Sequence, residues 1–182
     1  MNVNELQIIG FGHSGVNILN KIKSIYPKAF CIVLTADKEN LKISNADKSI
    51  LLSGDGLGCG LDYELGMRYV QNKQQEILDA IDLDKTTVLI SALGGGCSSG
   101  SFLECSRLLE EKQKFCTLIS FPMDFESKHR IRSSLFVMSQ LLEFVDETMI
   151  YPIEHPKNIK GKTLRTVFEL MDKKFIEQLE RI

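Results

Sequence analysis

The feature that most constrains the fold of this chain is a regular alternation of short apolar runs with longer amphipathic stretches. The runs are rich in β-branched and aromatic residues, which favours strands buried on both faces. The stretches repeat apolar residues every three or four positions, as amphipathic helices do. This pattern predicts an α/β fold of three layers, a mostly parallel, Rossmann-like sheet with helices on both faces. Strands are expected over residues 6–11, 30–34, 50–52, 87–93, 115–121 and 148–153, and helices over 14–25, 63–81, 101–112, 131–144 and 164–182.

Length, charge and hydropathy indicate a single globular domain and disfavour a nucleic-acid-binding or membrane-spanning protein. The 182 residues, 43% of them hydrophobic, suffice for a buried core, and we expect a single domain over 1–182. Lys and Arg number 22 against 24 Asp and Glu, which disfavours a nucleic-acid binder held mainly by phosphate contacts. No apolar run reaches the roughly 18 residues that indicate a membrane span, so no membrane insertion is expected. The first residues also lack the layout of a signal peptide.

The five cysteines are an odd number without a CxxC pair, which predicts reduced thiols in a cytoplasmic protein. Cys31, Cys97 and Cys116 fall in or beside expected buried strands, where packing is the ordinary role of a thiol. The sequence contains neither HExxH nor a Cys/His spacing typical of zinc, so we expect no metal site built by protein side chains alone.

Glycine clusters follow three of the expected strands, at the edge where open parallel sheets bind ligands. The first, over residues 10–15, matches GxGxxG between a strand and a helix. Its glycines let backbone N–H groups approach a phosphate at a helix N-terminus. With Asp37 as the ribose-binding acid after the second strand, the motif fits a dinucleotide domain. The alternative is a tight strand-to-helix turn that needs glycine only for packing.

A second cluster, residues 93–101, bears on this choice. It opens a helix and adds free N–H donors together with the hydroxyls of Ser98, Ser99 and Ser101. A dinucleotide domain needs one such loop, whereas a nucleoside triphosphate without a P-loop lysine benefits from two opposed loops and a bound cation. The alternative here is a flexible surface loop. The third cluster, residues 54–62, either wraps over a ligand or is a mobile loop that contacts none.

Together these clusters resemble the GTP-binding domain of the FtsZ/tubulin family. Residues 9–20 resemble the opening glycine loop of FtsZ, and GGGCSSGS resembles the family signature GGGTGTGS. Residues 58–66 and 121–130 resemble its GLGAGxxPxxG and PFxxEGxxR segments, all in family order. The resemblance implies a site for GTP or GDP, with Mg²⁺ held mainly by the nucleotide phosphates. The nucleotide-binding residues that it implies are Gly12, His13, Ser14, Asn17, Gly58, Gly60, Gly95, Gly96, Cys97, Ser98, Ser99, Gly100, Pro122, Glu126, Arg130, Phe168 and Asp172.

Two residues of the last helix bear on the base. Phe168 and Asp172 are four positions apart and so face one side of that helix. By the resemblance, Phe168 would stack on the purine, and Asp172 would accept from guanine N1–H and the N2 amine, donors that adenine lacks there. The alternative is a core Phe beside a solvated Asp. Glu126 would reach the ribose and Arg130 the sugar or phosphate, unless the two form only an exposed ion pair.

The loops also depart from the family pattern. Cys97, Ser98 and Ser99 stand where the signature has Thr, Gly and Thr, and His13 and Ser14 replace glycine or alanine. Cysteine is a weaker donor than threonine, and serine lacks the conformational freedom of glycine, so these changes would lower nucleotide affinity. The family asparagine after the sixth strand has no counterpart.

The sequence given ends at Ile182, in the helix that leads in FtsZ and tubulin to a loop of catalytic acidic residues and a second domain. Because that loop orients the attacking water in the neighbouring subunit, we expect GTP binding but poor hydrolysis without a partner that supplies it. The expected function is guanine-nucleotide binding in a cytoskeletal or cell-division assembly, through self-association or a full-length relative. The alternatives are a non-catalytic interaction module that regulates or caps filaments of such a relative, and an NAD-binding domain.

Overall fold

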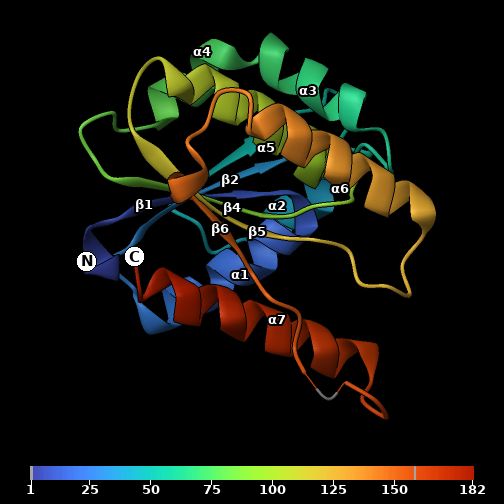
Figure 1. The fold of residues 1–182 in the computed structure, drawn as a ribbon. Coiled ribbons are helices and arrows are strands. Elements are labelled where there is room, and N and C mark those ends of the chain that lie inside the picture. Colours follow the sequence, from blue (N-terminus) through green and yellow to red (C-terminus); the bar gives the residue numbers. More distant parts are fainter. Residues whose placement is uncertain (1, 158) are drawn as a thin grey trace.

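The computed structural model describes residues 2–157 and 159–182 and consists of one six-stranded sheet between two layers of helices (Figure 1). All neighbouring strands are parallel, in the order β3-β2-β1-β4-β5-β6. The three-layer α/β architecture predicted from the alternating pattern is therefore confirmed. The strands are β1 Gln7–Phe11, β2 Phe30–Thr35, β3 Lys48–Leu51, β4 Thr87–Ala92, β5 Phe115–Ser120 and β6 Ile150–Pro152.

Helices cover both faces because alternate residues of each buried strand are apolar on opposite sides of the sheet. Ile8 and Val33 belong to the core under α1 and α7, whereas Ile9 and Leu34 belong to the core under α3, α4, α5 and α6 (Figure 1). The helices of the described residues are α1 Gly12–Ile25, α2 Lys38–Ile43, α3 Tyr63–Asn72, α4 Gln74–Ala80, α5 Gly96–Glu110, α6 Lys128–Leu141 and α7 Leu164–Leu179, with short 3-10 turns η1 Val3–Glu5 and η2 Glu147–Met149.

The order of the strands fixes where a ligand can bind. From β1 the chain proceeds outward through β2 to β3, then crosses back to β4 on the other side of β1. The carboxyl ends of β1 and β4 therefore lie side by side, with Gly10 paired to Ile90. Connections leave these two ends in opposite directions, which opens a crevice between them. Both strands run into helices there, β1 directly into α1 and β4 through a short glycine turn into α5.

Helices α3 and α5 approach so closely that only glycine fits between them. A Cβ on Gly66 would lie 2.6 Å from the carbonyl oxygen of Gly96. A Cβ on Gly100 would clash with the Tyr63 carbonyl oxygen and lie 2.9 Å from the Met67 nitrogen. This backbone-to-backbone packing holds the loop that precedes α3 against the first turn of α5.

Several observed helix ends differ from the expected ones by two or three residues, as in α6, which spans Lys128–Leu141 and not 131–144. Three differences are larger. Residues 63–81 form two helices because Lys73, at φ −119° and ψ 19°, leaves the helical conformation. The helix expected from residue 101 begins at Gly96, since its glycine-rich first turn packs on α3. Helix α2, capped by Asp37, was not expected, because six residues are too few to show a helical period. In the described part of the chain, no helix is both long and apolar enough to cross a bilayer.

Candidate functional site

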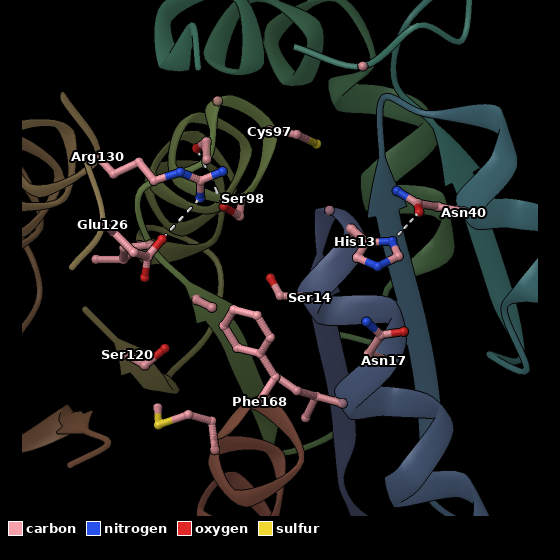
Figure 2. A pocket seen from close by; sticks show the side chains of 18 of the residues that line it. His13, Ser14, Asn17, Asn40, Cys97, Ser98, Ser120, Glu126, Arg130 and Phe168 are labelled. Carbon is pink, nitrogen blue, oxygen red and sulfur yellow. Dashed lines mark hydrogen bonds and ion pairs between the residues drawn. The ribbon is translucent and has the colours of Figure 1, made fainter. Parts of the chain in front are cut away.

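A cavity of about 840 Å³ lies at the crevice between the carboxyl ends of β1 and β4 (Figure 2). Its wall is built from the starts of α1 and α5, the loop before α3, the segment between β5 and α6, and one side of α7. It brings together 14 of the 17 residues implied by the family resemblance. These are Gly12, His13, Ser14, Asn17, Gly58, Gly60, Gly95, Gly96, Cys97, Ser98, Glu126, Arg130, Phe168 and Asp172.

Two helix N-termini open into this cavity. The residues that precede α1 and α5, Phe11 and Gly95, make no side-chain cap, and neither helix has an acidic residue in its first turn. The first N–H groups of a helix have no acceptor within it, and they carry the positive end of the helix dipole. Gly12 adopts φ +65° at the start of α1, where its ideal Cβ position is 3.3 Å from the Ser98 nitrogen. The site is therefore electrostatically suited to a multiply charged anion.

The loop before α3 lies against the N-terminus of α5. The Gly96 N–H donates to the Gly60 carbonyl at 2.9 Å, and the Gly58 N–H donates to the Ala36 carbonyl at 2.9 Å. Gly58 and Gly60 have φ of +84° and +53°, a region that L side chains rarely adopt. Hydrogen bonds thus tie this loop both to α5 and to the segment after β2, and Gly58 and Gly60 line the cavity.

Three residues implied by the resemblance lie behind the lining of the cavity. Ser99 is fully buried and its hydroxyl accepts from the Gly94 N–H at 2.8 Å, which stabilises the turn before α5. Gly100 makes the close contact with α3 described above. Pro122 packs against Gly94, whose φ of +105° and closeness to the proline ring both require glycine. In this structure these three residues shape the loops and do not face the cavity.

Phe168 and Asp172, the two residues expected to contact the base, line the part of the cavity formed by α7. Phe168 is 49% exposed, whereas the Asp172 side chain is only 15% exposed. These exposures are the opposite of the alternative interpretation, in which Phe168 would be buried in the core and Asp172 solvated. Lys21 of α1 donates to Asp172 Oδ2 at 2.7 Å. Burial raises the pKa of Asp172, while the Lys21 hydrogen bond and charge oppose that rise. A second cavity of about 490 Å³ lies beyond Phe168 and Asp172, so both residues have free space on two sides.

Glu126 and Arg130 lie on the opposite wall from His13 (Figure 2). Their closest charged atoms, Glu126 Oε2 and Arg130 Nη1, are 3.6 Å apart. Glu126 Oε1 also accepts from the Met123 N–H at 2.9 Å, which fixes the carboxylate on the turn after β5. The pair is therefore anchored in the cavity wall and is more than an exposed ion pair along a helix.

Cys97 is half-buried, lines the cavity and lies beside Cys59 of the loop before α3. A hydrogen bond from the Cys59 thiol lowers the pKa of Cys97, with help from Ser101, and raises that of Cys59. Burial raises the pKa of Cys31 and Cys105 to about 12, as expected for thiols that only pack. Among the described residues no group of three His, Cys, Asp or Glu side chains could hold a metal ion.

Two residues that sequence reasoning missed also shape the site. Asn40 of α2 lines the cavity and lies 2.7 Å from His13 Nδ1, and Lys21 holds Asp172. Neither belongs to a glycine cluster. The only sequence signal for Asn40 is its position three residues after Asp37, whose carboxylate caps α2 by accepting from the Glu39 N–H at 2.9 Å. Asn20, part of the first-loop resemblance, bonds Ile43 and Asn45 and so serves packing.

Comparison with known proteins decides the family. The model of the Tubulin/FtsZ family, GTPase domain, matches residues 5–159. The chain belongs to the Tubulin/FtsZ family. As a member of this family, it is 25% identical over 174 residues to cell division protein FtsZ of Rickettsia bellii, covering 92% of this chain and 38% of that protein. It is 25% identical over 158 residues to cell division protein FtsZ 2 of Pyrococcus furiosus, covering 80% and 39%.

Solved FtsZ-like structures share the fold of this Tubulin/FtsZ domain. An empty FtsZ dimer of M. jannaschii superposes with a TM-score of 0.84 at 23% identity, covering 95% of this chain and 52% of that one. The GDP-bound monomer of CetZ1 from Haloferax volcanii gives 0.82 at 19% identity, covering 95% and 58%. The chain thus spans about two fifths of the sequence relatives and about half of these structures.

Proposed function

We propose that residues 1–182 bind GTP and GDP in the cavity between β1 and β4, as part of a cytoskeletal or cell-division assembly in the cytoplasm. The observation that carries the proposal is the convergence of two uncapped helix N-termini, those of α1 and α5, on one cavity. Backbone N–H groups and helix dipoles at such positions bind phosphates. The free thiols of the described cysteines are consistent with a reducing compartment.

The far end of the cavity suits a guanine base. Phe168 offers a half-exposed ring for stacking, and Asp172 offers a largely desolvated carboxylate one helical turn away. Lys21 donates to Oδ2 at 2.7 Å, which favours the ionised carboxylate against the burial that raises its pKa, and leaves Oδ1 to accept from a ligand. Guanine presents two adjacent N–H donors to such a group and adenine does not. We assign Glu126 and Arg130, which lie across the cavity from His13, to contacts with the ribose and phosphates.

We assign Mg²⁺ mainly to the nucleotide phosphates, because Mg²⁺ commonly uses few protein ligands beside phosphate oxygens and water. Hydrolysis also needs a group that orients the attacking water. By the family resemblance that group comes from outside residues 1–182, so we propose that these residues bind GTP and that rapid turnover depends on a partner.

Binding is tested by releasing the ligand from the purified protein by heat and identifying it chromatographically, then by titration calorimetry with GTP, GDP, ATP and NAD. We expect guanine nucleotides to bind and ATP and NAD to bind at least tenfold more weakly. Asp172→Ala should abolish this preference, whereas Glu177→Ala, an exposed acid on the same helix, should not. Equal affinity for all four nucleotides, or an unaltered preference in Asp172→Ala, would refute the guanine assignment.

A second candidate function is a module that caps or regulates filaments of a full-length relative. It is favoured by the apolar side chains of Leu57 and Phe125, which are 77% and 55% exposed at the rim of the cavity. Exposed apolar side chains such as these mark surfaces that become buried when a partner protein binds. Mixing the chain with a full-length homologue should then lower the mass of sedimented filaments. No change at a molar excess of the chain would exclude capping.

A further inference from the structure

His13 stands in the first glycine loop where the family pattern has glycine or alanine. Its side chain is exposed, lines the cavity and belongs to the first turn of α1. Nδ1 of the ring lies 2.7 Å from Oδ1 of Asn40, and the second ring nitrogen points away from Asn40 (Figure 2). The orientation of the ring is thus set by a side chain 27 residues away.

The surroundings of Asn40 determine which ring nitrogen carries a proton. Asn40 is 5% exposed, and its Nδ2 donates to Thr35 Oγ1 at 2.9 Å. The Asp37 N–H also donates to Thr35 Oγ1, at 3.2 Å. With its amide nitrogen committed to Thr35, Asn40 turns its carbonyl oxygen to His13. A carbonyl oxygen can only accept, so the proton of this hydrogen bond lies on Nδ1.

Nε2 is therefore the ring nitrogen available to a ligand in the cavity. In the neutral ring Nε2 presents a lone pair, which repels a phosphate oxygen. In the imidazolium it presents an N–H and a positive charge, which form a strong charge-assisted hydrogen bond with phosphate. We propose that His13, positioned by Asn40, binds the nucleotide phosphates as an imidazolium, so that each nucleotide bound takes up a proton.

The remaining ionisable groups of the cavity wall are already engaged or lie on other elements. Glu126 pairs with Arg130 at the start of α6, and Asp172 of α7 pairs with Lys21. The partners of His13 are the neutral Asn40 and the positive ends of α1 and α5, close to Asp37 and Cys97. The described acidic side chain near His13 is Asp37, whose carboxylate accepts from the Glu39 N–H of α2. A bound phosphate would therefore add the negative charge that an imidazolium at His13 needs. Among the described residues, the charged or titratable side chains that line the cavity are His13, Asp37, Cys97, Glu126, Arg130 and Asp172.

The inference rests on the proposed nucleotide site, and proton uptake is a readout separate from binding. The 182-residue chain is titrated with GDP in two buffers of different ionisation enthalpy, at several values between pH 6 and pH 8. The wild type should take up more protons than His13→Gln, by up to one per nucleotide. Its affinity should fall with rising pH by up to about tenfold per unit relative to that variant, across the range where imidazole loses its proton. The comparison cancels protons exchanged by GDP itself.

Two further variants separate the ring from its support. His129→Gln, an exposed histidine outside the cavity lining, should behave as the wild type. Asn40→Asp keeps an acceptor for Nδ1–H and adds a negative charge, so it should move the fall in affinity to higher pH. GDP binding with equal proton uptake in wild type and His13→Gln would overturn this inference and leave the nucleotide site intact. Failure of the wild type to bind any guanine nucleotide would overturn both.

Discussion

Gly100 offers the sharpest test of how the glycine-rich first turn of α5 is held against α3. Its Cα lies against the backbone of α3, and an added Cβ would clash with the Tyr63 carbonyl oxygen. Ordinary van der Waals contact between such atoms begins at about 3.4 Å, so α3 and α5 would have to separate by more than an ångström. Neither partner is a flexible side chain that could turn away.

The expected cost follows from two opposing terms. Over-packing in a well-packed interior costs typically about 1–3 kcal/mol and more when backbone must move, which places this clash near the top at about 3–4 kcal/mol. Replacing glycine with alanine in a helix returns about 1 kcal/mol through helix propensity. The net loss for Gly100→Ala is about 2–3 kcal/mol. For a domain of this size that lowers the melting temperature by roughly 4–12 °C.

The measurement is thermal and urea unfolding of the nucleotide-free chain, with Gly54→Ala as the matched control. Gly54 is exposed, has no positive φ and would place a Cβ with nothing within 4 Å. We expect that control to stay within about 0.5 kcal/mol of the wild type. A melting temperature for Gly100→Ala within about 1 °C of Gly54→Ala would refute the close packing, and would favour a direct contact between Gly100 and ligand.

Three further predictions concern the ligand. Asp172→Asn should change the preferred base from guanine to xanthine, because the amide of Asn can donate a hydrogen bond to the 2-oxygen of xanthine. Competition between GDP and xanthosine diphosphate measures this preference, and a variant that still prefers GDP would contradict the prediction. Cys97 should be the first cysteine alkylated by iodoacetamide near pH 8, because the Cys59 hydrogen bond lowers its pKa while burial raises the pKa of Cys116 to about 11. Mass spectrometry should show that GDP protects Cys97 from alkylation, and faster labelling of Cys116 would contradict the prediction. GDP at a hundred times its dissociation constant should stabilise the fold by about 2.7 kcal/mol, so an unchanged melting temperature in calorimetry argues against specific binding.

The fold was predictable because its signals are local. Each strand of the sheet overlaps an expected apolar run, since a strand buried on both faces must be apolar along its length. The position of the site followed from glycines at strand ends. What escaped prediction depends on tertiary contact. The break at Lys73 is a change of backbone conformation that the apolar periodicity of residues 63–81 does not record, and the early start of α5 at Gly96 goes with its close packing against α3.

The site residues likewise divide into those that motif spacing could predict and those that depend on tertiary contacts. Motif spacing located His13 and Cys97, but it could not separate residues that face the cavity from Ser99 and Gly100, which support it, because both kinds occur in one run of glycine and serine. Asn40 could not be recognised, because its role arises from a hydrogen bond to a residue 27 positions away in a different element.

The span of the cavity along the chain has a consequence for synthesis. Its wall begins at Gly12 and is completed only by Phe175, and Lys21 finds its partner 151 residues later, at Asp172. If the cavity binds a nucleotide as proposed, a growing chain forms both helix N-termini long before Phe168 and Asp172 have left the ribosome. Phosphate-bearing metabolites of any kind could associate with that intermediate. Selection of the correct nucleotide would become possible only after α7 has docked on α1, late in translation.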